Sequence, residues 1–247
     1  MAALNKHVFT IRYQEGTTTP LGTDAWVDGV SIPAIQESTY ASGLAGLAAS
    51  TPESYYNNTW IGAGHGTTGS NLFKGTLYDI IWYDALLTDD EVQNTHDYLM
   101  NKHEMKNFDV YHGFTPTAPL PIVDERLRWW MDASDASTYE LDTNGQVTSW
   151  TSKDYANEVG TGTIGGAAVT PTDDKGFLFA DGYFQGYNCP FFKDSNFTCF
   201  LVFKYDDYSG SLFGQTASSQ TYGAYAIGRM SDNNVFNWDN WRTGPAT

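Results

Sequence analysis

The sequence predicts an all-β protein, an antiparallel sandwich of two sheets with one short helix near residues 88–103. Three observations support this. Several segments alternate between apolar and polar residues, which is the pattern of strands that bury one face. Glycine is plentiful and lysine scarce, as expected for many strands joined by turns, and 8 Trp, 16 Tyr and 14 Phe supply a large core. A capped segment with helical spacing accounts for the helix.

The N-terminal part begins with a clear alternating strand and a hairpin. His7–Tyr13 places Phe9 and Ile11 on one face, which we expect to be the inward face. Asp28 and Gly29 then separate two short apolar runs. This dipeptide accepts the positive φ angles of a type I′ turn, so the two runs are predicted to pair as a hairpin.

The strand at Leu77–Tyr83 is apolar on both faces. Strict alternation would put Tyr78, Ile80 and Trp82 on one face and the other four residues, Asp79 included, on the opposite face. Because both faces are apolar, we expect this strand to be covered on both sides. Asp79 is a single carboxylate in an apolar strand, and we expect it to be a structural hydrogen-bond acceptor.

The helix has start and stop signals of its own. Thr88 begins a capping box, since its hydroxyl can accept from the Glu91 amide while the Glu91 carboxylate reaches back to the Thr88 amide. The residues that predict its buried face recur at helical spacing and are Val92, His96 and Leu99. Lys102 and His103 fall in the last turn, where the helix dipole favours cations.

Beyond the helix, residues 107–121 contain three prolines and predict an extended connector. Residues 122–247 then hold a second series of strands. The strands expected there lie at 127–135, 146–152, 176–180, 183–187, 197–205, 211–214, 224–229 and 235–238.

Two segments resemble a known family. Residues 73–99 are similar to the last strand and last helix of concanavalin A-like, laminin-G-type jelly-roll domains. The matching positions are Phe73, Gly75, Leu77, Asp79, Ile80, Ile81, Tyr83, Leu87, Thr88, Glu91, Tyr98 and Leu99. Residues 127–150, from LRWWMDASD to QVTSW, resemble the opening of the same domains. Residues 152–157 depart from the Asp-Lys-Ser-Gly-Asn-Gly turn that the family has there. The resemblance implies a jelly-roll sandwich.

The order of the two segments is reversed relative to that family. The sequence therefore predicts one jelly roll whose closing half is 1–106 and whose opening half is 122–247, joined by 107–121. Three arrangements are compatible with this order. The chain is a circular permutant, or neighbouring chains exchange halves and form oligomers, or the sequence is a piece of a tandem array.

The net charge of −16 excludes some partners. A surface this acidic repels phosphate backbones, so we expect no nucleic acid. The sequence shows no apolar run long enough to span a membrane and no recognisable signal peptide, so we expect no membrane partner. Cys189 and Cys199 are expected to be either buried thiols or a disulfide.

The sequence favours a protein that is not an enzyme. Glucanases of the resembled fold carry Glu-x-Asp-x-x-Glu on one strand, and this chain has no such run. We expect no cofactor, with calcium as the alternative. The oxygen-rich candidates for calcium are Asp132, Asp135, Asp142 and Asn144. An Asx turn at Asp142 and local capping by the other aspartates are the competing interpretations.

The candidate glycan-binding residues are aromatic residues beside amides and carboxylates, a combination that suits sugar rings and hydroxyls. They are Trp238, Asp239, Asn240, Trp241 and Trp60. The competing interpretation is that these tryptophans belong to the core of the sandwich.

These features lead to two hypotheses of function. Domains like the resembled family usually lie outside the cell, and a chain without an export signal reaches that place on a virion released by lysis. We therefore expect a non-catalytic structural or adhesion protein on a bacteriophage surface, such as a capsid decoration or tail-fibre protein. Its expected partners are glycans or other virion subunits, and exchange of halves would make a homo-oligomer. The alternative is a carbohydrate-binding module of a bacterial surface or secreted system.

Overall fold

The computed structural model describes residues 5–14, 23–32, 58–63, 72–105, 123–153, 163–187, 196–206, 210, 212–216, 224–230 and 236–241. The first part of the chain contains β1 (His7–Tyr13), β2 (Thr23–Val27), β3 (Val30–Ile32), β4 (Asn58–Ile61), β5 (Lys74–Tyr83) and α1 (Asp89–Lys102). The second part contains β6 (Leu127–Asp132), β7 (Tyr139–Leu141), β8 (Val147–Trp150), β9 (Thr163–Gly166), β10 (Val169–Pro171), β11 (Phe177–Ala180), β12 (Gly182–Tyr187), β13 (Phe197–Tyr205), β14 (Phe213–Thr216), β15 (Ala224–Met230) and β16 (Phe236–Trp241).

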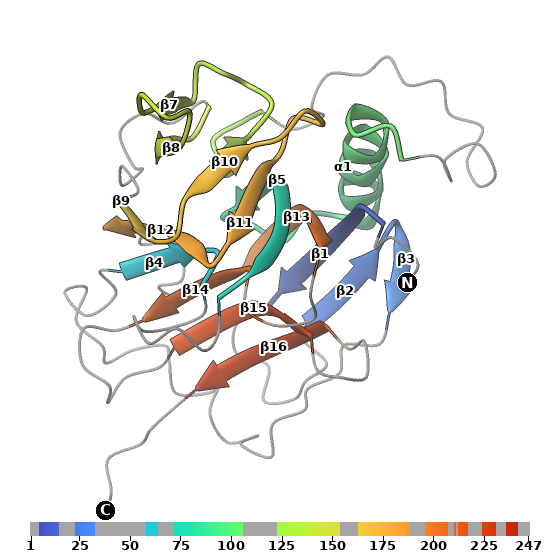
Figure 1. Ribbon diagram of the computed structural model, residues 1–247. Coiled ribbons are helices and arrows are strands. Elements are labelled where there is room, and N and C mark those ends of the chain that lie inside the picture. Colours follow the sequence, from blue (N-terminus) through green and yellow to red (C-terminus); the bar gives the residue numbers. More distant parts are fainter. Residues whose placement is uncertain are drawn as a thin grey trace, which may run out of the picture.

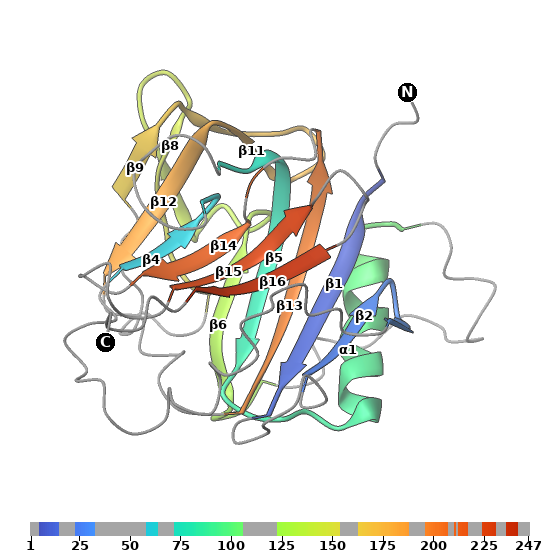
Figure 2. The same cartoon turned by 90° about the horizontal axis from the view of Figure 1, so that it is seen from below.

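The prediction of an all-β antiparallel sandwich with one short helix is confirmed (Figure 1). The larger sheet has the order β10-β11-β5-β13-β1-β2-β3, with β6 also paired to β5. The second sheet has the order β16-β15-β14-β4-β12-β9, and β7 and β8 form a small hairpin. In the view from below, the second sheet lies in front of the larger sheet and α1 lies behind it (Figure 2).

The main core fills the space between the two sheets. Trp82 of β5 stacks on Phe197 of β13 with ring centroids 4.3 Å apart, and Phe179 of β11 meets Phe184 of the second sheet edge-on at 5.7 Å. Burial of such large rings is the main stabilising contribution available to a sandwich of this kind. The first contact joins neighbouring strands of the larger sheet, and the second packs the two sheets against each other.

Strands from the two parts of the chain alternate within both sheets. In the larger sheet, β13 lies between β5 and β1. In the second sheet, β4 lies between β14 and β12. Each sheet is thus built from strands on both sides of residues 107–121, which themselves lie outside the described residues. The interpretation of 1–106 and 122–247 as permuted halves of a family domain stays a prediction.

The helix covers the outer face of the larger sheet, as the two apolar faces of Leu77–Tyr83 predicted. Its residues form a second buried cluster with side chains of β1, β5, β6 and β13; the members include Val8, Ile81, Val92, Leu99, Trp130 and Phe200. The capping box is confirmed, because the Thr88 hydroxyl accepts from the Glu91 amide and the Glu91 carboxylate accepts from the Thr88 amide at 2.8 Å.

A β-bulge in β5 corrects the predicted alternation. Val202 of β13 pairs with Asp79 and Phe203 pairs with Leu77, so Tyr78 has no opposite residue. The extra residue turns Leu77 into the main core with Ile80, while Tyr78 joins the helix side. The prediction was wrong for Leu77 and Tyr78, because a bulge places two successive residues on the same face. Asp79 stays on the face of Ile81 and Tyr83, which α1 covers, as alternation predicted, and the bulge brings Tyr78 to that face beside it.

Two local predictions of turn and strand chemistry give different outcomes. Asp28 and Gly29 have φ of 50° and 78°, as the predicted type I′ hairpin requires. Three short strands of the second part, β7, β9 and β10, were not expected from the sequence. They have three or four residues each, which is too short for an alternating pattern to show.

Across the described residues, no helix has the length and apolar character that crossing a membrane requires.

Candidate functional site

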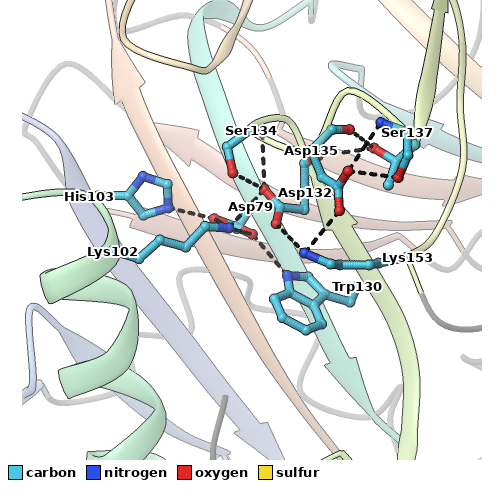
Figure 3. Close-up of polar contacts among 10 residues, drawn as sticks. Asp79, Lys102, His103, Trp130, Asp132, Ser134, Asp135, Ser137 and Lys153 are labelled. Carbon is cyan, nitrogen blue, oxygen red and sulfur yellow. Dashed lines mark hydrogen bonds and ion pairs between the residues drawn. The ribbon is translucent and has the colours of Figure 1, made fainter. Parts of the chain in front are cut away.

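A buried group of charged side chains lies where the end of α1 meets β5 and β6 (Figure 3). We call it the carboxylate–lysine cluster, and its members are Asp79, Lys102, His103, Trp130, Asp132, Asp135 and Lys153. They come from both parts of the chain. Strand β5 places the first of them on the face that α1 covers, and the C-terminal end of α1 supplies the next two.

Asp79 is the most enclosed member of the cluster, with an exposed fraction of 0%. Both of its carboxylate oxygens accept from the Lys102 ammonium, at 2.8 and 2.9 Å. The Trp130 indole N–H donates to Oδ1 at 3.0 Å, and His103 Nε2 lies 2.5 Å from Oδ2. The expectation that Asp79 is a structural hydrogen-bond acceptor is therefore met by three partners from α1, β6 and the helix end.

Asp132 is the second buried carboxylate and is 2% exposed. Its Oδ1 lies 2.8 Å from Lys102 Nζ, so this ammonium bridges the two aspartates. Lys153 approaches the other oxygen at 3.2 Å, and the Ser134 amide and hydroxyl donate to Oδ1 at 3.0 and 2.6 Å. The carboxylate thus links β6 to the helix and to the segment after β8.

Lys153 extends the cluster toward the surface. Its ammonium lies 3.0 Å from Asp135 Oδ2 and 4.6 Å from the centroid of the Trp130 ring. Asp135 also accepts from the Ser137 amide at 3.1 Å and hydroxyl at 2.7 Å. These bonds and the lysine lower the pKa of Asp135 to about 2, so this carboxylate is charged at every physiological pH.

The charges in the buried part stabilise each other. Burial alone would raise the pKa of Asp132, but the Lys102 charge, its hydrogen bond and Ser134 outweigh that effect and lower the pKa. Burial would lower the pKa of Lys102, yet Asp79 and Asp132 together raise it. The lysine therefore stays an ammonium and Asp132 stays a carboxylate near neutral pH. The cluster is therefore a network of ion pairs that joins the helix to the sheet.

The carboxylates predicted as calcium ligands accept hydrogen bonds from nearby amides or face lysines. Asp142 Oδ1 accepts from the Asn144 and Gln146 amides at 2.8 and 2.9 Å, which is the Asx-turn interpretation. Asp132 and Asp135 each accept from the amide two residues further on and face lysines. Within the described ranges, no three His, Cys, Asp or Glu side chains are grouped to hold a metal ion.

The predicted glycan residues fall in the second sheet. Trp60 of β4 is 4% exposed and packs against Tyr183 at 5.1 Å, so its ring is not available as a sugar platform in this structure. Trp238, Asp239, Asn240 and Trp241 lie in β16, the edge strand of that sheet, but their side chains are outside the described part of the structure. The structure does not bring Trp60 into the same strand pair as β16.

Of the two cysteines, only Cys199 lies within the described residues. Cys199 of β13 is a buried free thiol, and burial raises its pKa, so it remains protonated and unreactive. Cys189 lies outside the described residues.

The lysines and the histidine of the cluster were missed as site residues by sequence reasoning. Lys102 and His103 were assigned to the helix dipole alone, and Lys153 sits in the turn where the chain departs from the resembled family. One signal was present in the sequence. A single aspartate inside an apolar strand needs a buried cation, and a Lys-His pair ends the helix that covers that strand.

Comparisons of the chain with protein-family models, curated proteins and solved structures found no match. The resemblance to concanavalin A-like domains therefore rests on residues 73–99 and 127–150.

Proposed function

We propose that this protein is a non-catalytic structural or adhesion module that works on the surface of a bacteriophage particle. The observation that carries the proposal is the use of the buried carboxylates. The buried Asp79 and Asp132, and the partly exposed Asp135 next to them, all face lysines that belong to the same scaffold. Asp79 and Asp132 fix α1 on the sheet through Lys102, and a fixed sheet surface is what an assembly or adhesion protein presents to its partners.

A catalytic role for the same carboxylates is disfavoured by their surroundings. A general acid or base must exchange its proton with a substrate within hydrogen-bond reach. Asp79 is fully enclosed, and Asp132 is held as a carboxylate by Lys102. Asp79 therefore lacks access to a substrate, and the lowered pKa of Asp132 leaves it without a proton to donate near neutral pH. The cluster therefore supports a structural use better than acid–base catalysis on a substrate that arrives from solution.

The virion setting is supported by charge. The chain carries a net charge of −16, which opposes binding to the packaged genome and suits a location on the outside of the particle. On this proposal the protein is a capsid decoration or tail-fibre component, and its partners are other virion subunits or glycans.

Binding to particles tests the proposal. Purified full-length protein is mixed with bacteriophage particles stripped of their surface proteins, and the pellet is examined by cosedimentation and negative-stain microscopy. We expect saturable, ordered attachment to one type of particle. If the protein stays in the supernatant with every particle tried, the virion assignment is wrong.

The alternative function, a carbohydrate-binding module, is favoured by the position of β16. This strand is at the edge of the second sheet and carries Trp238 and Trp241. On a glycan array, Trp238→Ala and Trp241→Ala would each abolish binding if this alternative holds. Trp26→Ala is the matched control, because Trp26 is a half-buried tryptophan of the larger sheet. If neither the wild type nor any variant binds a glycan on the array, a purely structural role is favoured.

A further inference from the structure

Lys102 is placed for more than an ion pair. Its Nζ lies 2.8 Å from an oxygen of Asp79 and 2.8 Å from an oxygen of Asp132, so one amine meets two carboxyl groups at once. Both aspartates are essentially removed from solvent. The ring of Trp130 lies beside the amine, 5.7 Å from Nζ to the ring centroid. The site therefore holds an amine and two carboxyl groups that are largely shielded from solvent.

We infer that the carboxylate–lysine cluster is the site of an intramolecular isopeptide bond between Lys102 and Asp79. Nζ of Lys102 forms the new bond to Cγ of Asp79, and the bond from Cγ to one of its oxygens breaks. The ammonium loses two protons, and these leave with that oxygen as one molecule of water. The product is a neutral amide, so atoms and charge balance without an oxidant or any other co-reactant.

The neighbours of the two groups match the roles that this reaction needs. Asp132 accepts from Lys102 Nζ, and it is placed to take a proton from the amine and return it to the departing oxygen. The Trp130 N–H on Oδ1 of Asp79 polarises the carboxyl group and stabilises negative charge on that oxygen as the amine adds. His103 Nε2, beside Oδ2, supports the second oxygen.

Asp79 is favoured over Asp132 as the acceptor of the bond. The Lys102 amine lies 2.8 and 2.9 Å from the two oxygens of Asp79, whereas the Asp132 oxygen that it contacts also accepts from the Ser134 hydroxyl. Asp132 is also held by Lys153, which leaves it charged and suited to moving protons. Since the two carboxylates favour the ammonium form, the neutral amine is a minor species. We therefore expect the bond to form slowly after folding.

The bond would fasten the C-terminal end of α1 to β5 across 23 residues of sequence. Only the folded chain brings these groups together, so only folded molecules would form the bond. The inference does not depend on the proposed virion role, and its test uses no particle or glycan.

Mass spectrometry tests the inference on the full chain. The intact mass of folded protein, followed over days after purification, is expected to fall below the sequence mass by one water. A proteolytic digest then should contain a branched peptide that joins the Lys102 and Asp79 segments. Cyclisation of an aspartate to a succinimide also removes one water, and the branched peptide separates the two reactions.

Variants assign the roles. Lys102→Arg and Asp79→Ala are expected to keep the full sequence mass, and Asp132→Asn to slow or abolish the loss of water. Lys74→Arg is the matched control, because Lys74 lies on β5 like Asp79 but pairs with Asp181 outside the cluster, and this variant should still form the branched peptide. A wild-type protein that keeps its full sequence mass, or that loses water without a Lys102–Asp79 branch, overturns the inference whatever the variants do.

Discussion

At the scale of single residues, the buried His96 shows how the fold controls ionisation. Its side chain lies between α1 and β1, with Nε2 2.8 Å from the Thr10 hydroxyl and the Phe200 ring edge-on at 5.7 Å. Burial lowers the pKa of His96 from 6.5 to about 4. The unfolded chain therefore takes up a proton near pH 6.5, whereas the folded protein does so only near pH 4. Stability is lost as the pH falls through this window.

Replacing this histidine should flatten the pH dependence. Between pH 7 and pH 5 the free energy of unfolding of the wild type should fall by about 2 kcal/mol more than that of His96→Gln. Urea unfolding at a series of pH values measures it. His7→Gln is the control with the opposite sign, since the Asp28 hydrogen bond raises the pKa of the partly exposed His7, whose contribution is lost as the pH rises. Parallel curves for wild type and His96→Gln would contradict this account.

The carboxylate–lysine cluster gives a second prediction at this scale. Asp132→Ala removes a buried partner of Lys102 and Lys153 and should lower the free energy of unfolding by about 3–5 kcal/mol. Asp84→Ala removes the partner of Arg128 in a partly exposed pair, and it should cost about 1 kcal/mol or less. Chemical denaturation compares the two. Equal costs would show that the buried cluster has no special structural weight.

At the scale of elements, the start of α1 is fixed by its cap. The reciprocal bonds between Thr88 and Glu91 satisfy amides that the helix itself leaves unpaired. Arg126, just before β6, also binds Glu91 at 2.9 Å, so the cap is tied to the second part of the chain. The helix therefore begins where local chemistry and a long-range ion pair agree.

The cap should have a measurable value. Thr88→Ala is expected to destabilise the protein by about 1 kcal/mol, because one amide loses its acceptor. Asn94→Ala, at an exposed position of the same helix, is the matched control and should be neutral or slightly stabilising, because alanine is the better helix former. Thermal and urea unfolding measure both. If Asn94→Ala lowers the free energy of unfolding as much as Thr88→Ala does, the cap does not explain the loss of stability.

Elements with local signals were predictable from sequence, and those that depend on distant pairing were not. The Thr88 cap and the turn at Asp28 are determined by residues within four positions of each other. The bulge at Tyr78 was not visible, because it depends on the register of β13, more than a hundred residues away. The cluster was missed for the same reason. Lys102 has the ordinary sequence context of a helix end, and its partners become evident only when β5 and β6 pair.

At the scale of the whole molecule, the two parts of the chain depend on each other for their sheets. β13 lies between β5 and β1 and pairs with both, so without it each of these strands loses a hydrogen-bonded neighbour. Without β4, β14 and β12 lose theirs. Neither part has a complete sheet of its own in the described structure, so we expect the parts to fold and unfold together.

Cutting the chain between them tests this claim most directly. A protease site is inserted within residues 107–121, the full-length protein is folded, and the site is then cleaved. We predict that the two pieces remain together at the mass of the intact protein and unfold in one cooperative transition. Separation into two independently folded pieces, each with its own transition, would contradict the interleaved sandwich on which the account depends.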